Sequence, residues 1–237
     1  MKKGLKLIRK SEERGQADLG WLKAKYTFSF ADYFDRNYMG FRTLRVINQD
    51  IIQPSGGFAT HPHNDMEILT FVIRGTVEHK DSMGNSTLIP AGEVQLMSAG
   101  TGVRHSEFNP SSSDKLELLQ IWIVPDRKGH TPNYQQMKLD SRRGLNEWQQ
   151  LVGPYGLSHN GMSIHQQVAI YRGLAKSGQS LVFRSQHGGN IWIQIVDGEV
   201  EIEEDLLKAG DGLAMTESSQ ISLLAKKDGE VLLFDLG

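Results

Sequence analysis

The chain has 237 residues, of which 38% are hydrophobic and 23% are charged, and its formal net charge is -2. This length and composition predict a globular protein of one large or two small domains, and the near-neutral charge argues against a direct nucleic-acid binder. The absence of cysteine excludes disulfides, thiolate metal sites, iron–sulfur clusters and a cysteine nucleophile, so any metal must be held by nitrogen and oxygen.

The first fifteen residues, MKKGLKLIRKSEERG, are basic but lack the apolar run of a secretory signal. No stretch of the sequence approaches 18 apolar residues. We therefore expect a cytoplasmic protein without a membrane partner. The segment TFSFADYFD (27–35) is interpreted as a strand and turn that packs on the fold without taking part in chemistry.

Short apolar runs rich in Ile, Val, Leu and aromatic residues predict β-strands. They cover 41–49, 67–80, 93–98, 116–124, 190–204 and 230–236. Turn signals separate them, among them Met83-Gly84-Asn85, Pro90-Ala91-Gly92, Asp197-Gly198 and the run 209–212. Only residues 141–152 have a helical pattern. This arrangement indicates an all-β fold of the sandwich or barrel type.

An internal repeat in the sequence suggests that the fold is duplicated. The segments 68–97 and 191–215 show the same features in the same order. In each, an apolar strand ends at a glycine, alternation of apolar and polar residues resumes, and a turn of small residues precedes another apolar strand. A period of about 120 residues is too long for a solenoid and indicates a repeated domain. We expect two stacked antiparallel β-barrels, 1–130 and 131–237, with the boundary in a polar segment near 128–136.

The segment THPHNDME (60–67) places two of the chain's eight histidines on either side of a proline. In an extended segment, alternation of side chains puts His61 and His63 on one face. Pro62 restricts His61 to extended conformations and has no N–H, which argues against a central strand here. On its own the pair is a weak metal motif, and a solvated loop is the commoner interpretation.

A second pair of potential ligands favours a metal site over a solvated loop. In AGTGVRHSEFNP (99–110), His105 and Glu107 again face one way if the segment is extended, and a glycine-rich turn just before them would let the strand begin sharply. If the two pairs come from neighbouring antiparallel strands, three imidazoles and one carboxylate converge. That donor set suits Fe(II), Mn(II), Co(II), Ni(II), Cu(II) or Zn(II).

The pattern HxH-x3-E, followed by G-x2-H-x3-N from Gly102 to Asn109, resembles the two motifs of the cupin superfamily. Three longer segments, 26–50, 60–85 and 90–111, are similar more narrowly to the pirin family, especially to its bacterial quercetin 2,3-dioxygenases. The resemblance is strong from residue 15 to about 125 and weak over the remainder.

This resemblance implies a bicupin whose N-terminal barrel, residues 1–130, carries the metal site. It implies that the metal ligands are His61, His63, His105 and Glu107. It also implies that the C-terminal barrel, residues 131–237, has lost its ligands. The sequence agrees, because this half offers only isolated histidines, interpreted as surface or packing residues: His159, His165 and His187.

In cupins generally the glutamate after HxH is a ligand, whereas in pirins the carboxylate is the one that matches Glu107. Spacing alone leaves Glu67 open as a ligand. Glu67 and Asp65 are otherwise interpreted as groups that orient the ligands, or as exposed charges. We expect His79 to face solvent. Four aromatic residues are candidates for a pocket above the metal, with ordinary core as the alternative: Phe58, Phe71, Phe108 and Trp122.

The resemblance implies quercetin 2,3-dioxygenase activity, with a flavonol and O2 as substrates and Fe(II) favoured over Zn, Cu, Mn, Co or Ni. In this chemistry the flavonol 3-hydroxyl loses its proton, dioxygen attacks the electron-rich ring, and the ring opens to a depside with loss of carbon monoxide. Glu107 would act as ligand and as base.

Two other functions stay open. Pirins of animal cells bind transcription factors, so the first alternative is a metal- or redox-responsive interaction protein, although the sequence itself indicates no protein partner. The second is a cupin that binds a small ligand without metal.

Overall fold

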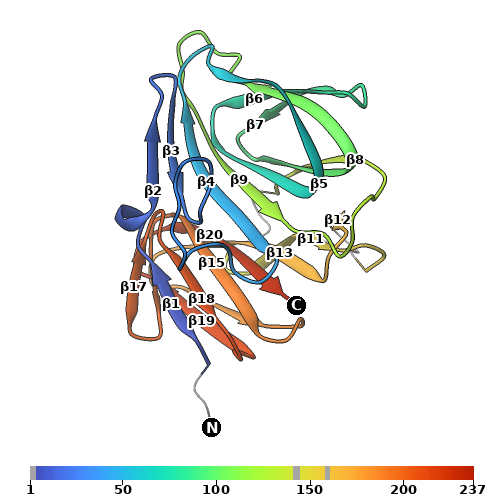
Figure 1. The fold of residues 1–237 in the computed structure, drawn as a ribbon. Helices are drawn as coiled ribbons and strands as arrows, with labels where there is room; N and C mark the ends of the chain where they lie inside the picture. Colours follow the sequence, from blue (N-terminus) through green and yellow to red (C-terminus); the bar gives the residue numbers. More distant parts are fainter. Residues whose placement is uncertain (1–3, 141–144, 158–160) are drawn as a thin grey trace. The chain divides into compact units, whose positions relative to one another are not determined.

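The computed structural model describes residues 4–140, 145–157 and 161–237, which form two compact units (Figure 1). The N-terminal unit is Gly15–Leu139, and the C-terminal unit combines the residues before Gly15 with Asp140–Gly237. Helix in the described residues amounts to one 3-10 turn, η1 (Ser11–Glu13), and no helix there could cross a membrane. The predicted all-β class is confirmed.

The N-terminal unit is one sheet with the order β2-β3-β4-β9-β5-β8-β6-β7, and β10 also pairs with β8. Its strands are β2 (Gly15–Asp18), β3 (Leu22–Tyr26), β4 (Leu44–Ile52), β5 (Gly57–Arg74), β6 (Thr76–Asp81), β7 (Ser86–Pro90), β8 (Glu93–Phe108), β9 (Leu116–Ile123) and β10 (Asn133–Lys138). The first half of β8 lies between β5 and β10, and its second half lies between β5 and β6. β8 therefore pairs with three of the described strands, β5, β6 and β10.

The C-terminal unit has two sheets, with the orders β1-β18-β15-β20-β13-β11-β12 and β14-β19-β16-β17. Its strands are β1 (Lys6–Arg9), β11 (Trp148–Pro154), β12 (Met162–Ile164), β13 (Val168–Ala175), β14 (Ser180–Arg184), β15 (Asn190–Asp197), β16 (Glu199–Ile202), β17 (Asp205–Lys208), β18 (Gly212–Met215), β19 (Gln220–Ala225) and β20 (Gly229–Leu236). Aliphatic residues from both sheets form its buried core.

The division expected at residue 130 differs from these units at two strands. β10 pairs with β8 from Asn133↔Ser98 to Lys138↔Glu93, which keeps this segment in the N-terminal unit. β1 pairs with β18, with Arg9 opposite Gly212, which places the start of the chain in the C-terminal unit. Each of these strands pairs with a strand far away in the sequence, about 35 to 45 residues for β10 and more than 200 for β1. Local composition gives no signal of such pairing.

The helix expected over 141–152 is wrong where the structure describes it. Residues 148–154 form β11, which pairs antiparallel with β13, and residues 141–144 lie outside the described residues. Leu151 and Val152 are fully buried on this strand. Tertiary pairing overrides local helix propensity here.

The glycine-rich turn expected before His105 is also wrong, because Gly100 and Gly102 lie inside β8. Gly100 has φ +47, and a Cβ at this position would overlap the carbonyl oxygen of His130. Glycine therefore lets a second segment approach the strand closely, and β8 continues without a break to His105.

Candidate metal centre

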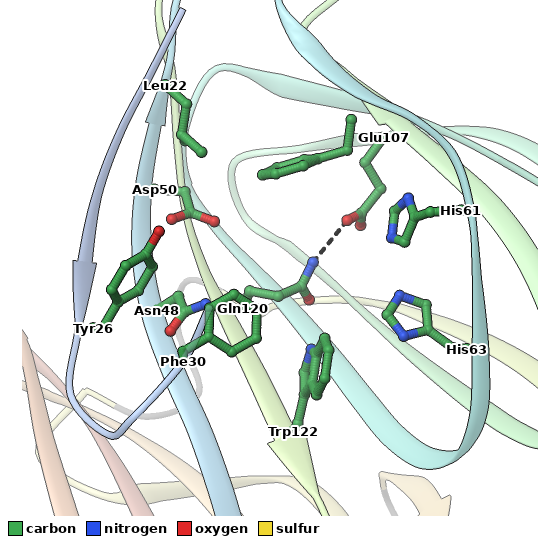
Figure 2. A pocket seen from close by; sticks show the side chains of 11 residues that line it. Leu22, Tyr26, Phe30, Asn48, Asp50, His61, His63, Glu107, Gln120 and Trp122 are labelled. Atoms are coloured by element: carbon green, nitrogen blue, oxygen red, sulfur yellow. Dashed lines mark hydrogen bonds between the residues drawn. The ribbon is translucent and has the colours of Figure 1, made fainter. Parts of the chain in front are cut away.

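Two neighbouring antiparallel strands, β5 and β8, bring the predicted histidines together. Their register places His61 opposite His105 and His63 opposite Val103. One potential ligand atom from each of His61, His63 and His105 lies within 4.8 Å of those of the other two. Figure 2 shows His61 and His63 pointing into the same cavity from β5. These three imidazoles therefore converge as the i, i+2 spacing predicts.

Pro62 occupies a stretch of β5 whose described strand pairing is on one side. Pro62 lies opposite Arg104 of β8, whereas the pairing of β5 with β9 begins at Glu67. The strand is thus central from Glu67 onward, and the expectation that it is not central holds only around the two histidines. A residue without an N–H fits this position, since no ladder bond to β9 is lost there.

The spacing of the imidazoles fits a shared cation. His61 Nε2 lies 3.0 Å from His105 Nε2, and His61 Nδ1 is 2.9 Å from the carbonyl oxygen of Ala59. Two nitrogens bound at about 2.1 Å to one ion and at a right angle would be ~3.0 Å apart. The Ala59 carbonyl accepts the Nδ1–H of His61 and leaves its Nε2 as the ligand atom.

Burial keeps these imidazoles in the form that binds metals. Desolvation, reinforced by His61, lowers the pKa of His63 to about 4. Desolvation, together with His63 and His61, lowers the pKa of His105 to about 2. Both rings are therefore neutral at physiological pH, with a lone pair available.

Glu107 is the carboxylate of the site and is 2% exposed. Gln120 Nε2 donates to Glu107 Oε2 over 2.7 Å (Figure 2), and the Thr70 hydroxyl lies 3.2 Å from Oε1. Burial raises the pKa of Glu107 to about 7 despite these two donors. It forms a cluster of potential ligands with His105 and His79, and it lines the same cavity as His61 and His63. A buried carboxylate beside neutral imidazoles is stabilised by a cation, so the donor set fits a divalent metal.

Glu67 and Asp65 lie outside both clusters of potential ligands that the described residues form. Glu67 is buried and accepts a hydrogen bond from Ser98 Oγ over 2.7 Å. Asp65 has φ +64 and accepts the backbone N–H of Gly129. These hydrogen bonds join β5 to Ser98 of β8 and to Gly129, and an orienting role of the two carboxylates toward the ligands stays a prediction.

The expectation that His79 faces solvent is wrong. Its side chain is fully buried, and its Nε2 lies 3.0 Å from Asp81 Oδ2. Potential ligand atoms of His79, His105 and Glu107 lie within 4.8 Å of one another. Alternation along β6 does not tell which face of this strand is covered, and the pairing of β6 with β8 decides it.

The cavity beside the histidines is walled by β3, β4 and β9 and by the segment before β4. Its lining is Leu22, Tyr26, Phe30, Asn48, Asp50, Phe58, His61, His63, Glu107, Gln120 and Trp122. Of the aromatic candidates, Phe58 and Trp122 line it, whereas Phe71 belongs to the buried core. The Trp122 ring meets the His63 ring edge-on with centroids 5.0 Å apart.

Several lining residues were not identified from the sequence. Phe30 lies in the segment 27–35, which was interpreted as packing alone. Asn48 and Asp50 belong to the polar stretch NQD (48–50) of β4, which gave no signal, whereas Gln120 is a polar residue in the largely apolar strand β9. A polar side chain in an apolar run is the signal that could have identified Gln120, because buried polar groups need a partner.

Comparison with known proteins places this arrangement in a family. The family model described as Pirin matches residues 7–123, and one described as the quercetinase C-terminal cupin domain matches residues 151–236. The chain belongs to the pirin family. A quercetin 2,3-dioxygenase of Escherichia coli K12 is 49% identical over 229 residues, which cover 97% of each chain. A pirin-like protein of Caulobacter vibrioides is 34% identical and covers 94% of this chain and 96% of its own.

The solved structure of the bacterial pirin YhhW from Escherichia coli in complex with nickel(II) has a TM-score of 0.92 and 47% identity. The match covers 98% of this chain and 99% of YhhW. The predicted membership of the pirin family and the bicupin fold are therefore confirmed.

The C-terminal unit of this pirin differs from the N-terminal unit in its histidines. His165 and His187 are half-buried, and His165 stacks on Tyr155 with ring centroids 5.0 Å apart. His159 lies outside the described residues. Both clusters of potential metal ligands found among the described residues belong to the N-terminal unit.

Proposed function

We propose that this chain is a metal-dependent dioxygenase that cleaves flavonols such as quercetin with O2. The observation that carries the proposal is the meeting of neutral imidazoles and a buried carboxylate at the wall of an aromatic-lined cavity. The name of the Escherichia coli relative, quercetin 2,3-dioxygenase, supports the same activity.

We assign the metal to His61, His63, His105 and Glu107. One divalent transition metal fits this set, with Fe(II) favoured and Zn, Cu, Mn, Co or Ni as alternatives. When bound, the ion would supply Lewis acidity toward the flavonol oxygen and a meeting point for substrate and dioxygen. The nickel(II) complex of YhhW agrees with an N/O site of this kind in a relative.

Glu107 is the group that would take the proton of the flavonol 3-hydroxyl. It lines the cavity, and its carboxylate oxygens are held by Gln120 and Thr70. A base held in a fixed orientation is the geometry that general-base catalysis needs. The role therefore follows from its position at the cavity wall and from its two partners.

The aromatic wall would hold the flat rings of the substrate. Phe30 meets Trp122 edge-on with centroids 5.4 Å apart, and Phe58 meets Trp21 in the same way at 5.1 Å. These rings present apolar surface beside the histidines and exclude water from the reacting centre.

The test is turnover of quercetin by protein that has been stripped with a chelator and reloaded with one metal at a time. We expect the visible absorption of quercetin to bleach only in loaded samples, with one O2 consumed and one carbon monoxide released per flavonol. Metal without protein is the control, because it measures spontaneous oxidation. Loaded protein that leaves quercetin unchanged would contradict the proposal and favour the interaction-protein alternative.

A further inference from the structure

A second buried imidazole, that of His79, lies behind His105 on the neighbouring strand. In the pairing of β6 with β8, His79 is opposite Glu107 and Asp81 is opposite His105. Side chains at paired positions share one face of a sheet, so His79 and Asp81 lie on the face that carries the site. The His79 and His105 ring centroids are 5.3 Å apart, and both side chains are excluded from solvent.

Two ring nitrogens in this pair have no hydrogen-bond partner among the described residues. They are Nδ1 of His79 and Nδ1 of His105, and both are buried. Unpaired buried polar atoms are rare in folded proteins, and each one calls for an explanation. Glu107, the nearby acceptor, is already engaged with Gln120 and Thr70.

Asp81 determines where the proton of His79 sits. Its Oδ1 accepts the backbone N–H groups of Met83 and Asn85, and its Oδ2 accepts the side-chain amide of Asn85 over 2.8 Å. The same Oδ2 lies 3.0 Å from His79 Nε2. A carboxylate so engaged accepts the Nε2–H of His79, which leaves Nδ1 of the neutral ring as an acceptor.

His105 has the opposite requirement. Its Nε2 faces His61 Nε2 at 3.0 Å, so this nitrogen is the one that would bind metal and must carry no proton. The proton of the neutral ring is then on Nδ1, which becomes a donor. The two unpaired nitrogens are therefore complementary, one an acceptor and the other a donor, although no hydrogen bond joins them at the ring positions of this structure.

We propose that His79, held by Asp81, is the positioning residue of the metal centre. A rotation of the two rings when metal binds would let Nδ1 of His79 accept the Nδ1–H of His105, which would fix the nitrogen that His105 presents to His61 and His63. This inference rests on the metal site of the proposed function. Metal-binding histidines commonly donate their second ring N–H to a group that orients them, and His79 supplies that acceptor from an adjacent strand.

Three substitutions test the role. His79→Phe removes the acceptor, whereas His79→Gln keeps an amide that can donate to Asp81 and accept from His105. Asp81→Asn presents an N–H to His79 Nε2, which moves the ring proton to Nδ1 and sets two donors against each other. Asn85→Ala is the matched control, because it removes one donor to Asp81 and leaves the contact between Asp81 and His79.

The measurements are the dissociation constant for cobalt(II), by competition with a chelator, and the visible absorption of the bound cobalt(II). We expect roughly 10- to 100-fold weaker binding and a changed absorption spectrum for His79→Phe and Asp81→Asn. His79→Gln and Asn85→Ala should stay close to the wild type. Thermal unfolding of each metal-free variant separates a folding defect from a loss of metal binding. If His79→Phe does not fold, the comparison of Asp81→Asn with Asn85→Ala tests the positioning role.

Unchanged affinity and spectrum in His79→Phe and Asp81→Asn, beside normal binding by the wild type, would overturn the positioning role alone. A lower unfolding midpoint with an unchanged cobalt(II) spectrum would likewise reduce His79 to a packing residue. Failure of the wild type to bind cobalt(II), nickel(II) or iron(II) would overturn the metal site and this inference with it.

Discussion

The two units repeat one pattern of strand pairing, and the repeat ends where the candidate site begins. Ile68 pairs with Met97 between β5 and β8, and Ile191 pairs with Met215 between β15 and β18, with the next three pairs in step. β5 and β8 have 18 and 16 residues, whereas β15 and β18 have 8 and 4. The C-terminal strands stop at Asn190 and Met215, and the extra length of the N-terminal strands carries the histidines.

The interiors of the two units also differ at the pairs that lie two residues further along β5 and β15. The N-terminal unit has polar residues at this level, which are Thr70 on β5, Gln95 on β8 and Gln120 on β9. The C-terminal unit has aliphatic residues at the same register, which are Ile193, Leu213 and Leu233. All three aliphatic residues are buried in its core.

This difference indicates what the burial of Glu107 requires of the interior around it. Glu107 can be buried because Gln120 and Thr70 offer donors to its oxygens. A carboxylate among aliphatic side chains would have no such partners and would be strongly destabilising. One strand pattern thus supports a site in one unit and an apolar core in the other.

The largest expected effect is the loss of the two histidines on β5. His61→Ala with His63→Ala removes two of three imidazoles, so bound metal should fall from stoichiometric to background, and turnover with it. Elemental analysis after reconstitution measures this. His165→Ala with His187→Ala is the matched control in the C-terminal unit and should keep full metal content. Metal retained by the first double variant would contradict the assignment.

Glu107→Gln should have the next largest effect. The amide keeps an oxygen toward the metal but cannot take a proton, so some metal should remain while turnover falls about 10²- to 10⁴-fold. Steady-state rates and metal content are measured on the same sample. Full activity would remove Glu107 from the mechanism.

Gln120→Leu makes the N-terminal unit resemble the C-terminal unit, where Leu233 occupies this register. Glu107 loses one donor, so we expect metal affinity or turnover to fall roughly 10- to 100-fold. Gln95→Leu is the matched control, because its buried amide has no hydrogen-bond partner among the described residues. It should leave the metal in place and raise the free energy of unfolding by about 1–3 kcal/mol. Equal losses in both variants would show that general polarity, and not the donor to Glu107, matters.

The last prediction concerns two glycines at matching places of the repeat, Gly75 and Gly198, and it is an effect on stability and not on the metal site. Gly75 and Gly198 both have φ +82, and a Cβ on either would press on backbone, that of Lys115 or of Asp228. Gly75→Ala and Gly198→Ala should each lower the free energy of unfolding by about 2–5 kcal/mol, from backbone strain and overpacking together. Gly84 has φ +97 with open space around it, so Gly84→Ala should cost only about 1–2 kcal/mol. Denaturant unfolding of the metal-free protein tests whether the two places are equivalent, and a Gly198→Ala cost no larger than that of Gly84→Ala would break the comparison.

Much of the fold follows from local pattern. The apolar runs at 41–49, 67–80 and 116–124 contain strands where they were expected. The sequence repeat between 68–97 and 191–215 corresponds to the same register between β5 and β8 as between β15 and β18. The helix expected over 141–152 failed where the structure describes the segment, because β11 gains a partner in β13 that local propensity does not encode.

The candidate site divides in the same way. The spacing of His61 and His63 and that of His105 and Glu107 is a local property, and strand alternation was enough to predict their common faces. The environment of His79 is not local, because β6 is buried against β8 by pairing between Asp81 and His105. Periodicity gives alternation but does not give which side of a strand is covered.

By itself, the sequence determined several of the strands, the duplication, the family and the histidine pairs, because each of these depends on residue types and spacings along one segment. The tertiary structure decided which partner each strand takes. It thereby decided that Glu107 lies against His79 as well as His105, and that Gln120 and Thr70 hold its carboxylate. The physical reason is that a β-sheet is stabilised by hydrogen bonds and side-chain pairs between segments far apart in the chain, and no local pattern specifies them.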